Sequence, residues 1–389
     1  MTVSLNNRTA EGKKRAFSLD LARGAMLLLI ALAHAPLYLY ASEPGLMQRV
    51  ASTNFFDQVV NLFGVFFIDN RARAMFAVLF GYGLVLSFNS QLSKGIMEKD
   101  AVKTIRRRSW YLMLFGFLLA VFIGGQDILM AYGLAGLLVS SLLTREIKTL
   151  IRTLAIITFI YCLSTPILWG FNLQEMQSYG FPPEFLATDT YLKTLVSNLF
   201  SFPIIPIMIH IMFPVLPSVL AGMWIARYHL LTKPERHIKT LSFMTLIGLT
   251  VSFLGALPLS FLGSLWRPSF FASGVIYGLH LLTGFAGGLA YAAAFGLIGA
   301  KLKEPKLFSY AFMALGKRSL TFYVWNEAML VLFLSPAALD LGGRVSNGEA
   351  ALIAAGIWIV SVALASLLEK NNLNGPVESL LRHLVYKKK

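Results

Sequence analysis

The first apolar stretch of the chain, SLDLARGAMLLLIALAHAPLYLY, carries three ionisable residues whose spacing brings them together. At about 100° per helical residue, the path from Arg23 to His34 makes three turns plus about 20°, and Asp20 lies about 60° to the other side of Arg23. The rise between Arg23 and His34 is about 16 Å. Because ionisable groups inside a membrane are costly, this face should meet protein or water and is a candidate functional site.

These residue types suit acid–base and anion chemistry. His34 is suited to act as a base, because the reference pKa of histidine, about 6.5, leaves it largely unprotonated at neutral pH. The alternative for His34 is a structural hydrogen bond between helices. Arg23 has three open interpretations: an interfacial side chain, an ion pair with Asp20, or a ligand for a phosphate or carboxylate.

A second polar group follows near the expected outer surface. Arg71 and Arg73 lie at the outer end of the second apolar run and are candidates to bind substrate. Asp127 opens the motif DILMAYGLAGL, which also contains the candidate substrate contact Tyr132. Asp127 fits two interpretations, because a carboxylate caps a helix N-terminus well but could also orient a catalytic histidine or bind an acceptor.

A third group lies in LGKRSLTFYVWNE, at the start of the ninth apolar run. Lys317 and Arg318 suit either lipid phosphates or the phosphates of a cytosolic nucleotide-like cofactor. Asn326 and Glu327 lie further into the membrane, where a carboxyl group needs polar partners, and both are candidates, with His280, to bind substrate. His280, in the middle of the eighth run, is one candidate partner for Glu327, although the sequence does not show that the two helices adjoin.

The elements that would position these groups are membrane helices. The 389 residues are 56% hydrophobic and only 14% charged, and the mean hydropathy is +0.66. These values lie outside the usual range for soluble domains and predict an all-α, polytopic transmembrane bundle of about ten spans. The runs lie near 17–41, 68–90, 109–125, 128–143, 150–170, 203–226, 240–263, 271–300, 308–334 and 350–369.

Three segments make up the expected organisation: a cytoplasmic segment at 1–16, the bundle at 17–369, and a cytoplasmic amphipathic tail at 370–389. Four prolines in the run 203–226 predict a kinked or broken helix. The apolar stretch 54–67 is either an interfacial helix or the start of a long second span.

Basic residues favour cytoplasmic termini. With the N-terminus inside, the inner segments hold 25 Lys and Arg residues and the outer segments hold four: Arg49, Lys193, Arg267 and Arg344. The formal charge of +15 therefore indicates anionic lipid as a partner. A nucleic-acid partner is not expected, because the basic residues lie between apolar runs rather than in one patch with stacking aromatics.

Several common catalytic classes are disfavoured. The chain has no Walker loop, dinucleotide glycine fingerprint, H-E-x-x-H or G-x-S-x-G motif, which argues against an ATPase, a metalloprotease and a serine hydrolase. Cys162 is the only cysteine, so a disulfide framework or thiolate metal cluster is not available. No metal is expected.

Five motifs together resemble the YeiB-like bacterial membrane proteins, a family catalogued as domain of unknown function 418. They are DLARG (Asp20 to Gly24), MFAVLFGYGL (Met75 to Leu84), DILMAYGLAGL (Asp127 to Leu137), LGKRSLTFY (Leu315 to Tyr323) and GPVESLLRHLVY (Gly375 to Tyr386). The YeiB-like C-terminal part spans about 227–386. The ninth-run motif departs from the family at Lys317, Phe322 and Asn326, where relatives commonly have arginine, asparagine and glutamine.

The family is in turn distantly similar to the transmembrane acyltransferases, which include the acyltransferase-three and heparan glucosaminide acetyltransferase proteins. The Arg23 to His34 spacing matches that of the acyltransferase-three proteins, whereas YeiB-like relatives often have asparagine at His34. The resemblance implies transfer from a cytosolic acyl-CoA to an acceptor outside, in the plasma membrane. His34 and Asp127 would be catalytic, and Asp20, Arg23, Lys317 and Arg318 would hold the donor. A proton-coupled or small-molecule transporter is the alternative, with His34, His280 and Glu327 as proton carriers.

Overall fold

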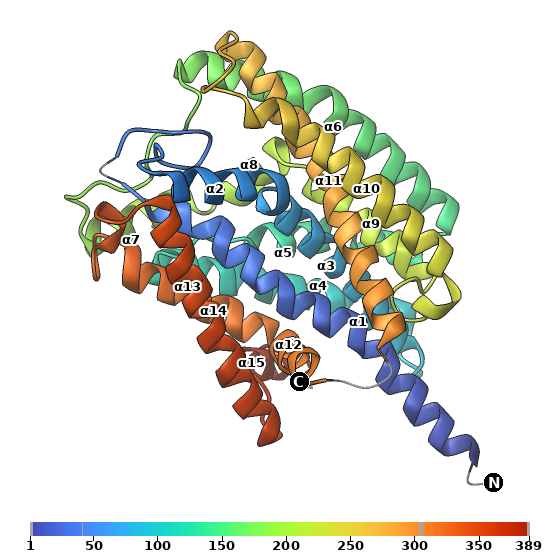
Figure 1. The fold of residues 1–389 in the computed structure, drawn as a ribbon. Coiled ribbons are helices and arrows are strands. Elements are labelled where there is room, and N and C mark those ends of the chain that lie inside the picture. The colour runs from blue at the N-terminus through green and yellow to red at the C-terminus, as the bar shows by residue number, and fades with distance from the viewer. Residues whose placement is uncertain (1–2, 41, 303–305, 387–389) are drawn as a thin grey trace.

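The computed structural model describes residues 3–40, 42–302 and 306–386, with side chains from residue 17 onward. Within these ranges the regular secondary structure is helical, without a strand, and only isolated bridges such as Pro44 with Val50 join the loops. Figure 1 shows the resulting helical bundle. Helices satisfy their own backbone hydrogen bonds, which is the requirement that a membrane imposes on a spanning segment. The all-α prediction is confirmed.

The described elements follow one another as α1 (Val3–His34), η1 (Ala35–Tyr38), α2 (Phe55–Phe63), η2 (Gly64–Ile68), α3 (Arg71–Leu92), α4 (Glu98–Leu118), η3 (Leu119–Ile123), α5 (Leu129–Val139), η4 (Ser140–Thr144), α6 (Ile147–Met176), α7 (Tyr191–Ser201), α8 (Ile205–Met212), α9 (Val215–Arg227), η5 (Pro234–Arg236), α10 (Ile238–Ser260), α11 (Phe270–Lys301), α12 (Leu307–Lys317), α13 (Ser319–Leu334), η6 (Leu341–Gly343), α14 (Asn347–Lys370) and α15 (Pro376–Tyr386).

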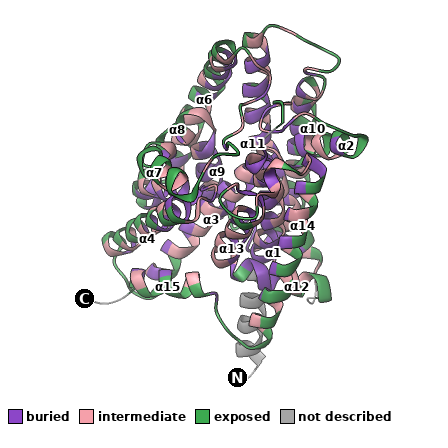
Figure 2. Ribbon diagram, turned by 90° about the vertical axis from the view of Figure 1, so that its left-hand side faces the viewer, coloured by how far each residue is buried: buried purple, intermediate pink, exposed green. Residues whose placement is uncertain are grey.

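Helix α1 lies at the centre of the bundle and packs against α3, α11, α12, α13 and α14. Its residues Met26, Leu27 and Ala31 are buried, as expected of a helix surrounded by protein. In Figure 2 the buried residues lie mainly in the inner helices, and exposed residues mark the outward faces of the peripheral helices. This central position allows the polar face of α1 to meet protein rather than lipid.

The peripheral helices α6, α10 and α11 lie side by side and expose apolar side chains. On α10, for example, Phe243, Leu246 and Leu254 are exposed. Contiguous apolar exposure of this kind suits contact with lipid tails.

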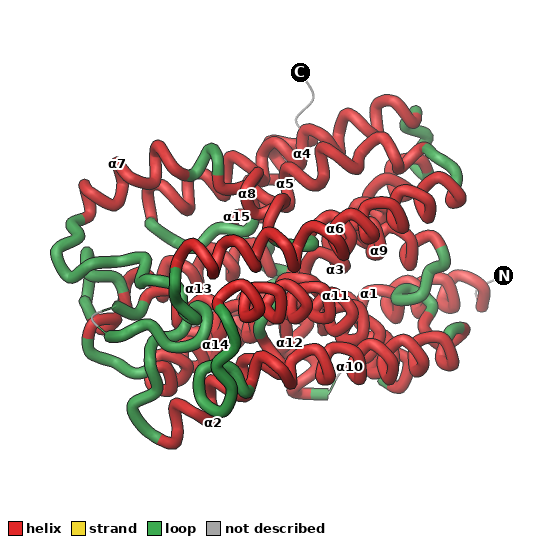
Figure 3. Tube along the Cα trace, turned by 90° about the horizontal axis from the view of Figure 1, so that it is seen from above, coloured by secondary structure: helices red, strands yellow, loops and turns green. Residues whose placement is uncertain are grey.

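The two ends of the bundle differ. Figure 1 places α15 and the beginning of α1 at one end, here called the α15 end, and α2 at the opposite end, here called the α2 end. Figure 3 shows the long loops gathered beside α2 and α7. Backbone hydrogen bonds between Met47 and Tyr179 and between Phe181 and Met47 join the loops 39–54 and 177–190 there.

The number of long spans is smaller than predicted. Within the described residues, six helices are long and apolar enough to cross a membrane, or seven if the bent pair α7 and α8 counts as one. The prediction of about ten spans is not confirmed, because some apolar runs form shorter helices. The run 203–226 breaks between α8 and α9 at Phe213 and Pro214, as its prolines predicted, and the run 308–334 breaks between α12 and α13.

The stretch 54–67 forms α2 and the π-helical turn η2, which lead into α3. Together, 55–92 is a run of 38 residues, about 57 Å at 1.5 Å per residue, nearly twice the hydrocarbon thickness of a bilayer. Asn70 adopts a left-handed conformation (φ 63°) at the junction. Because α2 also exposes Phe55, Phe56 and Phe63, it has the character of an interfacial helix.

The N- and C-terminal segments are helical where they are described. Residues 3–16 continue α1, their side chains lying outside the described part, and α15 forms the tail after α14. Helix α15 turns Leu381 and Val385 inward, so the tail packs on the bundle. Residues 1–2 and 387–389 of the predicted terminal segments lie outside the described residues.

Glycines bring α3 and α9 into close contact. A Cβ atom on Gly222 would overlap the backbone carbonyl of Val78, and one on Gly81 would overlap that of Val219. Gly81 and Gly222 therefore permit the close approach of the two helices. Gly83 instead faces the guanidinium of Arg23, with Nη2 3.4 Å from the position of a Cβ atom.

We expect Gly222→Ala to destabilise the protein by about 1–3 kcal/mol, because a backbone carbonyl cannot move aside as a side chain can. Gly356 on α14 provides a matched control, since nothing lies within 4 Å of its Cβ position. Thermal unfolding in detergent should show a lower midpoint for Gly222→Ala and no loss for Gly356→Ala. Equal midpoints for the two variants would contradict the packing argument.

Candidate active site

His34 and Glu327 form a hydrogen-bonded pair between α1 and α13. His34 Nδ1 lies 2.6 Å from Glu327 Oε1, and Tyr38 Oη donates to Glu327 Oε2 at 3.2 Å. Glu327 is fully buried, whereas the His34 side chain keeps 12% of its exposure. The suggested partner of Glu327, His280, lies elsewhere, so His34 takes that place. With a carboxylate at Nδ1, the Nε2 atom of His34 is left as an acceptor.

Two tyrosines fix the turn between η3 and α5. Tyr38 Oη accepts from the backbone N–H of Gln126 at 2.9 Å. Tyr323 Oη donates to the carbonyl of Gln126 at 2.8 Å and accepts from the N–H of Ile128 at 3.1 Å. The phenol groups of η1 and α13 thereby satisfy the backbone polar groups that a buried turn would otherwise leave unpaired.

Asp127 caps α5. Its two carboxylate oxygens accept from the N–H groups of Leu129 and Met130, each at 2.8 Å. Of the two interpretations of Asp127, the structure therefore supplies direct contacts for capping. The carboxyl group also borders the cavity into which His34 projects.

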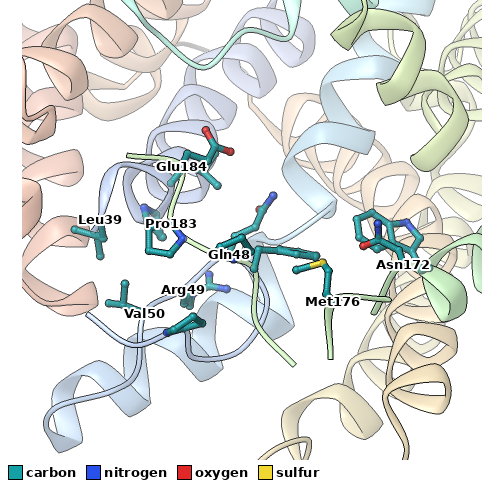
Figure 4. Close-up of a pocket in the computed structure, with 14 residues that line it drawn as sticks. Leu39, Gln48, Arg49, Val50, Asn172, Met176, Pro183 and Glu184 are labelled. Carbon is teal, nitrogen blue, oxygen red and sulfur yellow. The ribbon is translucent and has the colours of Figure 1, made fainter. Parts of the chain in front are cut away.

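Three adjoining cavities open at the α2 end, and Leu37 and Gln48 line all of them. The largest, about 640 Å³, is lined by His34, Arg73 and Asp127. A second, of about 40 Å³, also touches His34 and Arg73. The third is about 420 Å³, and Figure 4 shows Gln48 in its middle, between Glu184 and Asn172. We call the three together the His34 vestibule.

Arg71 and His280 belong to a buried network beside the vestibule. Arg71 is fully buried and donates from Nε and Nη2 to the hydroxyl and carbonyl of Ser252. Its Nη1 donates to the carbonyl of Asp69 at 2.8 Å and lies 3.0 Å from His280 Nε2. These bonds occupy the guanidinium and hold η2, α3, α10 and α11 together.

Arg49 and Asp69 form an ion pair on the vestibule wall. Arg49 Nη2 donates to Asp69 Oδ1 at 2.9 Å, tying the loop 39–54 to the start of α3. Burial by itself lowers the pKa of Arg49, but the Asp69 carboxylate more than offsets burial and raises that pKa above its ordinary value. Arg49 therefore stays charged and paired.

Arg73 differs from its neighbours. Its guanidinium carbon lies 3.9 Å from the centre of the Phe213 ring, and its Nη1 is buried without a hydrogen-bond partner among the described residues. Arg73 lines the two cavities that His34 also lines, the one of about 640 Å³ and the one of about 40 Å³.

A separate cavity, of about 190 Å³, lies towards the α15 end and is here called the Arg23 cavity. Its polar wall includes Arg23, Arg108 and Lys317. Arg23 Nη1 lies 3.5 Å from Asp20 Oδ1, so the ion pair, one of the three interpretations of Arg23, forms at long distance, and Arg23 also lines the cavity. Arg108 Nε is buried and unpartnered within the described part of the chain.

Arg108 is a site residue that the sequence interpretation missed. It lies in the run Arg106–Arg108, where all three residues were counted as juxtamembrane charges. The helical period provided a signal, because Arg108 shares a face with Ile105 and Leu112, both of which are buried. An arginine on the apolar face of an amphipathic helix is a candidate for function rather than for headgroup contact.

Lys317 and Arg318 have different roles. Arg318 is 5% exposed and donates to the carbonyls of Ala314 and Leu373 and to Glu369 Oε2. It therefore joins α12, α14 and the segment that leads to α15, rather than lining the cavity. Lys317 pairs with Glu369 at 2.5 Å and borders the Arg23 cavity.

The predicted substrate contacts Asn326 and Tyr132 lie in different places. Asn326 Oδ1 accepts from Ser361 Oγ of α14 at 2.6 Å, which directs this side chain away from the vestibule. Tyr132 Oη donates to the backbone carbonyl of Arg73 at 2.9 Å, and its ring lines the Arg23 cavity.

One short segment separates the two cavities. Asp127 and Ile128 line the His34 vestibule, whereas Leu129 and Tyr132 line the Arg23 cavity. Tyr323 also touches both sides, since it lines the Arg23 cavity and holds the turn that lines the vestibule. The bundle therefore has polar cavities at two depths along α1, next to Arg23 and next to His34.

An all-helical bundle with several long apolar helices and buried ionisable groups defines an integral membrane protein. Residues 225–388 match the family model described as protein of unknown function (DUF418), and this region of the chain belongs to that family. The match runs from the end of α9 to α15 and includes Lys317, Arg318 and Glu327. No protein of established annotation matches the chain.

Proposed function

We propose that the protein is a membrane acyltransferase, which moves an acyl group from an acyl-CoA-type donor in the Arg23 cavity to an acceptor in the His34 vestibule. The observation that supports this proposal most is the arrangement of the two cavities on either side of the segment 127–132. A donor and an acceptor entering from opposite ends would meet there. Holding two reactants in this way converts a bimolecular step into an effectively unimolecular one.

The proposed orientation has the α15 end and both termini in the cytoplasm of a plasma-membrane protein. The excess of basic residues in the segments expected inside supports it. Short apolar helices such as α5, α9 and α13 would complete about ten crossings in this arrangement. Broken helices are tolerated at membrane depth where they border protein or a water-filled cavity.

The Arg23 cavity has the two kinds of surface that such a donor needs. Arg23, Arg108 and Lys317 would bind phosphate oxygens, while Phe76 and Leu84 offer apolar contact to a pantetheine or acyl chain. At about 190 Å³, the cavity is below the common size of a small-molecule site, so only the reactive end of the donor would enter it.

His34 would act as the base. Its Nε2 would remove the proton from the acceptor hydroxyl or amine as the acceptor attacks the thioester carbonyl carbon. Glu327 would stabilise the resulting imidazolium through Nδ1, as a buried carboxylate orients histidine in other acyl-transfer enzymes. The imidazolium proton would then pass to the leaving thiolate, so that free thiol and acylated acceptor are the products.

A transporter is the second candidate function. The bent pair α7 and α8, with 64° between the two helices, supports it, because broken helices next to a cavity are common in transporters. Uptake of a solute into vesicles under an imposed proton gradient, without consumption of an acyl donor, would favour this function over acyl transfer.

The test of the acyltransferase proposal is donor binding to the purified protein in detergent. We expect acetyl-CoA or a longer acyl-CoA to raise the thermal midpoint, since a ligand at 100 times its Kd adds about 2.7 kcal/mol to the free energy of unfolding. Arg108→Ala should abolish most of this stabilisation. Arg107→Ala is the matched control, because Arg107 is adjacent in the chain and its side chain is exposed.

Retained stabilisation in Arg108→Ala, or loss of equal size in Arg107→Ala, would contradict donor binding in the Arg23 cavity. If no acyl-CoA raises the thermal midpoint of the wild-type protein at any concentration that the assay tolerates, the acyltransferase proposal itself fails.

A further inference from the structure

The guanidinium of Arg73 is a half-buried cation without a counterion. Its side chain projects from the first turns of α3, one face covers the ring of Phe213, and Nη1 makes no hydrogen bond within the described residues. The ring face stabilises a cation but does not accept the N–H hydrogen bonds of a guanidinium. A buried N–H group of a cation that lacks an acceptor is costly, so Nη1 of Arg73 is a candidate to bind a ligand.

The other charged groups around the vestibule have partners. Arg49 pairs with Asp69, and Lys193 pairs with Asp189 at 2.6 Å. His34 pairs with Glu327.

Two carboxylates on the same wall are also occupied. The oxygens of Asp127 accept from the first turn of α5, and Glu184 Oε2 accepts from the amide of Gln126 at 2.5 Å. Within the described part of the chain, Arg73 is therefore the cation of the vestibule that no carboxylate neutralises.

Arg73 is also placed where a ligand could reach it. It lines the cavity of about 640 Å³ and the adjoining one of about 40 Å³, and His34 lines both of them as well. The larger cavity falls within the usual range of small-molecule sites. A molecule held at Arg73 would therefore present its remainder to His34.

We propose that Arg73 binds an anionic group, a phosphate or a carboxylate, of the molecule that occupies the His34 vestibule. A guanidinium offers paired N–H donors that match the oxygens of either anion. The inference deepens the proposed function, since it assigns the acceptor to the class of anionic hydroxyl or amine compounds. Anion binding itself does not depend on acyl transfer.

The anion has two sources, a soluble metabolite or a lipid headgroup. An apolar cavity of about 230 Å³, lined by Val121, Leu195 and Leu332, shares Gly124 and Thr194 with the vestibule. An acyl chain of a lipid would fit beside the vestibule there.

The experiment compares Arg73→Met with wild type in thermal unfolding at constant ionic strength. Methionine keeps the packing on Phe213 and removes the charge. The soluble probes are inorganic phosphate, glycerol 3-phosphate and acetate, and the lipid probes are phosphatidylglycerol and phosphatidylcholine in nanodiscs. Arg344→Met is the matched control, because that side chain is 69% exposed.

We expect at least one anionic probe to stabilise wild type and Arg344→Met, and the apparent Kd to rise about tenfold or more in Arg73→Met. Arg73→Lys should restore part of the affinity. Without ligand, Arg73→Met should unfold at the same midpoint as wild type or higher, because a half-buried, unpaired charge with an unsatisfied Nη1 group has been removed. Stabilisation by glycerol 3-phosphate would identify a soluble ligand, and stabilisation by phosphatidylglycerol alone would identify a lipid.

Equal stabilisation of Arg73→Met and wild type would overturn the proposal, as would the absence of any anion effect on wild type. A lower midpoint of ligand-free Arg73→Met would also overturn it, since it would give Arg73 a structural role. Arg108→Ala should keep the Arg73-dependent effect. Failure of acyl-CoA binding with this effect intact would refute the proposed enzyme and leave the anion site standing.

Discussion

Replacing His34 by alanine should lower acyl transfer by about 10²- to 10⁴-fold, the usual contribution of a positioned general base. The reason is that Nε2 borders the vestibule while Nδ1 is held by Glu327, 2.6 Å away. The transfer would be measured as radiolabel incorporated from acetyl-CoA into inverted membrane vesicles. These vesicles present the proposed donor side to the medium.

Donor binding provides the control for this prediction. Stabilisation by acyl-CoA should persist in His34→Ala, because Arg23 and Arg108 lie in the other cavity. His383→Ala, on the exposed face of α15, should keep full transfer. Glu327→Gln should reduce turnover more than donor affinity, since it keeps a hydrogen-bonding group but removes the charge that stabilises the imidazolium. Undiminished incorporation in His34→Ala would exclude the histidine as the base.

Arg318→Ala should be the most destabilising of the substitutions considered. Its side chain is 5% exposed and joins Ala314, Glu369 and Leu373, so its removal leaves buried carbonyls without donors. Breaking a buried pair by removing one partner costs about 3–5 kcal/mol. Glu369 remains paired with Lys317, so we expect a loss near the lower end of that range.

The adjacent lysine provides the comparison. Lys317 pairs with the same carboxylate, but its side chain is 44% exposed, and exposed pairs contribute about 0–1 kcal/mol. Thermal unfolding in detergent should therefore show a large drop for Arg318→Ala and a small one for Lys317→Ala. If the two midpoints coincide, Arg318 does not anchor the C-terminal segment, and its assignment to donor binding regains support.

The local pattern was sufficient for features that depend on one helix. The shared face of Asp20, Arg23 and His34 could be predicted from the helical period alone. The prolines of 203–226 predicted the break before α9. Capping was also one of the two interpretations of Asp127. It could be predicted from the sequence because a cap involves the residues that follow directly in the chain.

Features that join distant segments were harder to foresee. Glu327 lies almost 300 positions after His34, and the suggestion of His280 as its partner was wrong because α11 directs that histidine towards Arg71. Arg108 was counted with its neighbours as a surface charge, although it shares a helical face with Ile105 and Leu112, and the packing of α4 shows that this face borders the Arg23 cavity.

Composition and charge alone determined that this chain is a helical membrane protein, because apolar runs of this length have few other stable environments. The helical period also determined that Arg23 and His34 share a face. The tertiary structure decided what that face meets: a cavity with Arg108 beside Arg23, and the carboxylate of Glu327 beside His34. The physical reason is that a helix fixes its own spacing through local hydrogen bonds, whereas its neighbours depend on packing between segments far apart in the sequence.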